Sequence, residues 1–181
     1  MVELGCDEKY VEIVLNSHMT TEGKAIALNN TLIHTNSIFA TLGETISKTI
    51  QKALYNGIND KDDESIPGIV DIIKQIDNKI KSNGLTIISI NQICYDDQSA
   101  VLLDIVCKDV KGNAHIIDIT TQHGNTERDY KDTIKKLTDV AKNVYKNQLQ
   151  SVSVVSIKLD YNYDIYNNQI TNLSANHIAK W

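Results

Sequence analysis

Residues 102–121 read LLDIVCKDVKGNAHIIDITT, and this stretch decides how the chain folds. The polar segment Asp109–Asn113 separates two apolar runs, which predicts a β-hairpin with strands over Ala100–Lys108 and Ala114–Thr121. Gly112 suits the left-handed position of a three-residue hairpin loop. Both runs are apolar on successive residues, a pattern typical of strands at the centre of a sheet with both faces covered.

Two acidic residues interrupt these apolar runs at matching positions. A three-residue loop centred on Lys111 makes the strand pairing symmetric about that residue. Asp104 and Asp118 then become direct cross-strand partners, with Cβ atoms about 5 Å apart. Like charges so placed repel each other, and a divalent cation or a shared proton would remove the repulsion. Oxygen ligands favour Mg²⁺ or Mn²⁺. Alternatively, a register shifted by one or two residues would leave both aspartates near strand ends, in water.

The remaining pattern places helices before this hairpin, and one helix and one strand after it. Apolar residues at helical spacing predict the helices, and a change to shorter apolar runs predicts the strands. The expected segments are a strand or helical turn at Tyr10–Leu15, helices at Ser37–Tyr55, Pro67–Gly84 and Glu127–Asn147, and strands at Leu85–Tyr95 and Ser151–Leu159. This order predicts an α/β protein with a mixed central β-sheet flanked by helices and an N-terminal helical lobe.

The length of 181 residues predicts a single domain. The helical lobe is expected over about 1–84 and the α/β core over about 85–181. The net charge of −5 argues against a generic basic nucleic-acid coat, but not against an enzyme that grips nucleic acid through metal ions. No apolar run is long enough for a membrane helix or resembles a signal peptide, and the 3 cysteines form no C-x-x-C pair. These features predict reduced thiols in a cytosolic protein without membrane association.

The order of these motifs resembles the PD-(D/E)xK nuclease superfamily, in which acids on two adjacent strands are followed by a helix and a strand. Asp104 matches the first acid, although Leu103 stands where the family has proline. Asp118 matches the second acid, and Thr120 stands where the usual form has lysine. An acid-x-Thr step with the lysine moved to the next helix is similar to the cap-snatching endonucleases. Those endonucleases lie at the N-terminus of bunyavirus-like L polymerases and in the influenza polymerase acidic subunit.

The resemblance implies a pair of Mn²⁺ ions, with Mg²⁺ as the alternative. The implied ligands are His34, Asp71, Asp104, Asp118 and the carbonyl of Ile119. Asp104 would bridge the two ions, His34 would share the first ion with Asp118, and Asp71 would support the second ion. His123 is the alternative histidine and Asp77 the alternative helix acid.

The resemblance also implies residues that assist catalysis without being metal ligands. Thr120 alternates onto the Asp118 face of its strand, so its hydroxyl would orient that carboxylate or a metal-bound water. A lysine of the following helix would stabilise charge that develops on the phosphate. Lys131 flanks the apolar stripe of that helix, while Lys135 fits the family spacing as well or better; Lys108 is a third candidate.

The implied activity is a divalent-metal-dependent RNA endonuclease that cleaves capped host mRNA to make primers for viral transcription. The chain would then be an endonuclease domain within a viral RNA-dependent RNA polymerase, in the host cytoplasm and the virion. Its partners would be single-stranded capped RNA and the rest of that polymerase, with the isolated domain a monomer. The alternatives are a RecB-like DNA nuclease with a displaced lysine, a catalytically inactive nuclease-fold interaction domain, and an α/β binding module whose two aspartates are incidental.

Overall fold

The computed structural model describes residues 8–57, 66–95, 100–123, 129–164 and 169–180. The predicted order of helices, hairpin, helix and strand is confirmed, and a further strand follows. The elements are α1 (Glu8–Asn16), α2 (Thr21–Asn56), α3 (Ile69–Ser82), β1 (Thr86–Tyr95), β2 (Ala100–Lys108), β3 (Ala114–His123), α4 (Lys131–Tyr145), a 3₁₀ turn (Lys146–Gln148), β4 (Leu149–Asp164) and β5 (Gln169–Lys180). None of the described helices is long and apolar enough to cross a membrane.

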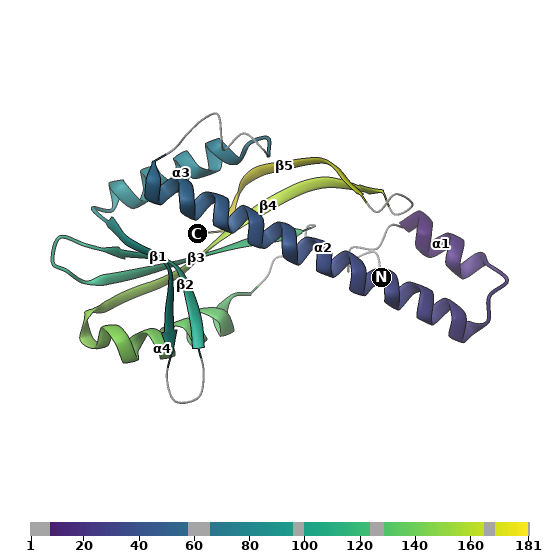
Figure 1. Ribbon diagram of the computed structural model, residues 1–181, viewed down its shortest axis with the longest axis horizontal. Coiled ribbons are helices and arrows are strands. Elements are labelled where there is room, and N and C mark those ends of the chain that lie inside the picture. Colours follow the sequence, from purple (N-terminus) through teal and green to yellow (C-terminus); the bar gives the residue numbers. More distant parts are fainter. Residues whose placement is uncertain (1–7, 58–65, 96–99, 124–128, 165–168, 181) are drawn as a thin grey trace.

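The strands form one sheet in the order β1-β2-β3-β4-β5. All neighbours are antiparallel except β3 and β4, which are parallel and are joined through α4. A mixed sheet flanked by helices was predicted and is confirmed. Figure 1 shows α2 and α3 on one side of this sheet and α4 on the other.

Two apolar clusters hold the helices to the two faces of the sheet. The α3 stripe of Ile69, Ile72, Ile73, Ile76 and Ile80 is buried, as its helical spacing predicts. These side chains pack with Ile46 and Ile50 of α2 against one face of the sheet. On the opposite face, Leu137, Val140 and Ala141 of α4 pack against the strands. The helices that precede β1 therefore share a core with the sheet.

Three segments differ from the sequence prediction. Tyr10–Leu15 lies within the helix α1, and α2 begins at Thr21 rather than Ser37, with the Thr20 side chain accepting a hydrogen bond from the Gly23 N–H at its start. The N-terminal part of α2 extends beyond the sheet and carries α1 (Figure 1). The strand β5 was not predicted.

The predicted place of Pro67 in the first turn of a helix is wrong. Helix α3 begins at Ile69, and Gly68 precedes it with φ 84°, a left-handed conformation that suits glycine. The Pro67 carbonyl accepts a hydrogen bond of 2.9 Å from the backbone N–H of Ala175 in β5. The turn before α3 is therefore fastened to the last strand.

The predicted register of the central hairpin is confirmed. Lys108 pairs with Ala114 and Ile105 with Ile117, which makes the pairing symmetric about the loop. Gly112 has φ 85°, as the left-handed loop position requires. The Asp109 carboxylate accepts hydrogen bonds from the N–H groups of Lys111 and Asn113, at 2.8 and 2.9 Å, and so closes the loop.

Helix α2 crosses β3 at a glycine. A Cβ on Gly43 would lie 2.6 Å from Thr121 Oγ1, which is closer than the two atoms can pack. We expect Gly43→Ala to lower the free energy of unfolding by about 1–3 kcal/mol through overpacking. In a Thr121→Ala background the same substitution should stabilise by roughly 1 kcal/mol, because alanine favours the helix. Urea unfolding of the four proteins measures both values; equal effects in the two backgrounds would contradict this packing.

Candidate metal site at the sheet fork

The sheet divides in the middle. β2 pairs with β1 from Tyr95↔Ala100 to Thr86↔Lys108, and β3 pairs with β4 as far as His123↔Leu159. Yet β2 and β3 pair with each other only between Ile105↔Ile117 and Lys108↔Ala114. Beyond that point the residues 100–104 and 118–123 share no ladder. We call these two segments the sheet fork. Its apex is the point where the ladder between β2 and β3 ends, and Asp104 and Asp118 are the residues next to that point.

The side chains of β2 change from one face of the sheet to the other at the apex of the fork. Side chains alternate along a regular strand, so Leu103 and Ile105 would face the same side. Instead Leu103 packs in the cluster beneath α4, and Ile105 packs in the cluster beneath α2 and α3. Asn91 of β1, which lies between the partners of Leu103 and Ile105, has φ 51°, so β1 bends at the same level. This twist carries the outer half of the hairpin away from β3 and opens the fork.

The Asp104 side chain spans the fork and joins α2 to β3. Its Oδ2 atom accepts a hydrogen bond of 2.7 Å from the backbone N–H of Ile119 and one of 3.3 Å from Ser47 Oγ. Burial raises the pKa of Asp104, and the contacts with Ile119, Ser47 and Gln51 lower it by less. The net pKa is raised, yet each donor is a contact that the ionised form prefers.

Asp118 lies opposite Asp104 when the hairpin register is continued by one residue. Its neighbours Ile117 and Ile119 pack toward α2 and α3, so alternation turns Asp118 to the α4 side. Burial raises the pKa of Asp118, and the nearby charge of Asp104 raises it further, to about 7. The two half-buried carboxylates therefore lie close enough for the charge of Asp104 to disfavour ionisation of Asp118.

The backbone of Ile119 adds an oxygen atom to this pair. Its N–H points to Asp104, and in an extended strand the N–H and C=O of one residue point to the same side. The Ile119 carbonyl is thus directed into the fork, where β2 offers it no ladder partner. Two carboxylates and one carbonyl form the kind of oxygen set that Mg²⁺ and Mn²⁺ prefer. Thr120 follows on β3, half-buried, with Ser156 as its β4 partner.

The other two implied side-chain ligands, His34 and Asp71, lie on the helices α2 and α3. The His34 backbone lies about 20 Å from Ser47 along α2, at a helical rise of about 1.5 Å per residue. Ligands of one ion lie about 2 Å from it, so this placement does not let His34 share an ion with Asp118. Asp71 is exposed in the first turn of α3. Among the side chains that the structure describes, no three His, Cys, Asp or Glu residues form a metal-binding group.

The three candidate lysines are exposed. Lys131 is exposed at the start of α4 and pairs with Asp129 at 3.0 Å, and Lys135 is exposed one turn later. Lys108 ends β2 beside the hairpin loop, four residues from Asp104. The predicted contact between a lysine and the phosphate site stays a prediction, because the structure contains no substrate. His123 ends β3, and its side chain lies outside the described residues.

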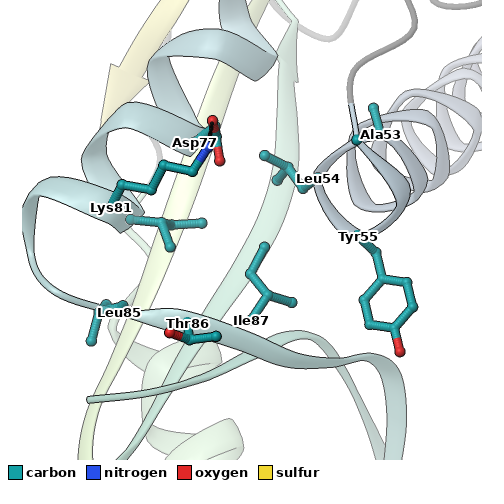
Figure 2. Close-up of a pocket in the computed structure, with 10 residues that line it drawn as sticks. Ala53, Leu54, Tyr55, Asp77, Lys81, Leu85, Thr86 and Ile87 are labelled. Atoms are coloured by element: carbon teal, nitrogen blue, oxygen red, sulfur yellow. Dashed lines mark hydrogen bonds and ion pairs between the residues drawn. The ribbon is translucent and has the colours of Figure 1, made fainter. Parts of the chain in front are cut away.

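The alternative acid Asp77 belongs to a different part of the molecule. It forms an ion pair of 2.6 Å with Lys81 at the rim of a pocket of about 470 Å³ between the ends of α2 and α3 and the start of β1. Figure 2 shows this pair on α3 facing Leu54 and Ile87 across the pocket. The lining is largely apolar and includes neither Asp104 nor Asp118. This pocket is therefore separate from the sheet fork.

The sequence did not reveal Ser47 and Gln51. They lie one helical turn apart on α2 and are far from Asp104 along the chain, so no local spacing connects them to the hairpin. The only signal is a pair of polar residues beside the apolar positions Ile46 and Ile50. The chain was also compared with known protein families, with curated proteins and with solved structures, and none of them matches it.

Proposed function

We propose that the protein is a divalent-cation-dependent nuclease whose metal site is the apex of the sheet fork. The observation that carries this proposal is the placement of two carboxylates opposite each other, with the pKa of Asp118 raised to about 7 by burial and by Asp104. Buried like charges destabilise a fold unless something compensates them. A divalent cation compensates both at once, and the Ile119 carbonyl supplies a third oxygen ligand.

The order of elements supports the same class of enzyme. The sequence resemblance implies acids on two adjacent strands, then a helix, then a strand. Asp104 lies on β2, Asp118 on β3, and α4 and β4 follow. A PD-(D/E)xK-like core is therefore the finer fold that we propose for this α/β protein.

The residues of the fork have distinct roles in this proposal. A bound cation supplies a water of lowered pKa and neutralises charge on the phosphodiester. Asp104, Asp118 and the Ile119 carbonyl would hold the cation. The Thr120 hydroxyl orients the adjacent carboxylate. Lys131 or Lys135 would reach the phosphate from α4 when substrate is bound.

We propose single-stranded RNA as the substrate, on the resemblance to cap-snatching endonucleases. On the same basis, we propose that the domain works within a viral RNA-dependent RNA polymerase in the host cytoplasm and takes primers from capped mRNA. His34, by its position on α2, is left out of the ligand set that we propose. Preferential cleavage of single-stranded DNA would instead favour the RecB-like alternative.

Metal binding tests the proposal directly. Mn²⁺ at 100 times its Kd should stabilise the protein by about 2.7 kcal/mol relative to EDTA, which raises Tm by roughly 5–10 °C at this chain length. Asp104→Asn should abolish both this shift and Mn²⁺-dependent cleavage of single-stranded RNA. Glu22→Gln, at an exposed acid near the start of α2, is the matched control and should change neither. If neither Mn²⁺ nor Mg²⁺ raises the Tm of the unmodified protein, the non-catalytic alternative is the better description.

A further inference from the structure

Two polar residues of helix α2, Ser47 and Gln51, form a hydrogen-bonded chain to Asp104. Gln51 Nε2 donates a hydrogen bond of 2.8 Å to Ser47 Oγ, and Ser47 Oγ donates in turn to Asp104 Oδ2 at 3.3 Å. The two α2 residues and the Ile119 N–H therefore hold the Asp104 carboxylate from two elements of the fold, the helix and β3.

Gln51 is an energetically unfavourable residue at this buried position. Its side chain is only 1% exposed, it follows the fully buried Ile50, and its Oε1 atom has no hydrogen-bond partner among the residues that the structure describes. An unpaired buried oxygen costs about 1–3 kcal/mol. A leucine or methionine would fill the same volume without that cost, so packing alone does not account for the amide. What the amide does provide is a donor to Ser47, which in turn donates to Asp104.

We infer that Ser47 and Gln51 are positioning residues that fix the Asp104 carboxylate for cation binding. This inference rests on the nuclease function proposed above. A free aspartate at the bend of β2 could rotate, and each rotation would move its oxygens away from Asp118 and from the Ile119 carbonyl. The α2 donors and the Ile119 N–H restrict that rotation before any cation arrives. Partners behind a metal ligand commonly change metal affinity 10–100-fold when they are removed.

The experiment compares Mn²⁺ binding by the full chain and its variants, using isothermal titration calorimetry. Gln51→Met keeps the length of the side chain and removes both donors, and Ser47→Ala removes the hydroxyl. Each is expected to weaken Mn²⁺ binding about 10–100-fold. Thr45→Ala is the matched control on the same helix, since the Thr45 hydroxyl is exposed and bonds only to the Thr41 carbonyl. It should leave the Mn²⁺ affinity unchanged.

A purely structural role for Gln51 gives a different result. The Tm in EDTA would then fall in Gln51→Met while Mn²⁺ affinity stayed the same, which would overturn the inference and leave the proposed function intact. We expect the reverse pattern, a Tm in EDTA within a few degrees of the unmodified protein together with weakened Mn²⁺ binding. If Gln51→Met does not fold, Ser47→Ala decides by the same affinity criterion. Absence of Mn²⁺ binding by the unmodified protein would instead reject the proposed function, and this inference with it.

Discussion

Gly68→Ala is expected to lower the free energy of unfolding by about 3–5 kcal/mol. Gly68 has φ 84°, and a residue with a Cβ in this conformation is strained by about 1–3 kcal/mol. The added Cβ would also overlap the carbonyl oxygen of Ala175, which belongs to the backbone of β5 and has no freedom to move aside. Overpacking of this kind costs about 1–3 kcal/mol more. The effect is large because the substitution opposes the contact that joins α3 to the last strand.

The steric part of this effect is separable from the backbone part. Gly84, just beyond α3, has φ 66°, and a Cβ there would meet open space. Gly84→Ala should therefore cost only the conformational strain, roughly 1–2 kcal/mol. Chemical unfolding of both variants beside the unmodified protein gives the comparison. Equal losses in the two variants would show that β5 does not lie against Gly68 in solution.

Asp118→Asn is expected to stabilise the protein in EDTA at pH 8 by up to about 4 kcal/mol. Burial and the charge of Asp104 raise the pKa of Asp118 to about 7, against 3.8 for the ordinary group. The native state thus keeps this proton over a range in which the unfolded chain releases it. Stability from the proton is fully present below pH 3.8 and is lost as pH rises to about 7. Three pKa units correspond to roughly 4 kcal/mol.

The pH profile of the free energy of unfolding tests this assignment. In EDTA the unmodified protein should lose stability between about pH 4 and 7, whereas Asp118→Asn should keep only the part of this decline that the raised pKa of Asp104 contributes. The two proteins should be nearly equal at pH 4 and furthest apart at pH 8. Asp71→Asn serves as the control and should keep the decline of the unmodified protein. Parallel curves for the unmodified protein and Asp118→Asn would show that Asp118 is not buried beside a charge.

The central hairpin was predictable because local chemistry determines it. A glycine with positive φ and a polar loop set the register, and the register in turn sets Asp104 opposite Asp118. The isoleucine stripe of α3 was equally readable, since its period is that of a helix with one buried face. β5 gave no such signal, because its pairing with β4 shifts register between Ser156 and Ile157 and twice more along the strand. Each shift breaks the alternation that identifies a strand.

Only the part of the candidate site that lies in the hairpin was predictable from the sequence. Ser47 reaches Asp104 from another element, 57 residues away in the chain, and no sequence pattern encodes that approach. His34 and Asp71 were assigned through a resemblance, which predicts residue types and order but not the length of a helix. The continuous helix α2 places His34 far from the fork, and α3 leaves Asp71 exposed.

The order of the strands in the sheet also bears on how the chain assembles. Every strand lies beside the strand that precedes it in the chain, so each pairing needs only one connection to close. Folding can therefore follow synthesis, with α2 and α3 available before β1 and with α4 as the one crossover. The exception is the contact of Ala175 with Pro67, which joins the last strand to a turn formed much earlier. Until β5 pairs with β4, the edge of β4 stays open to pairing with another chain.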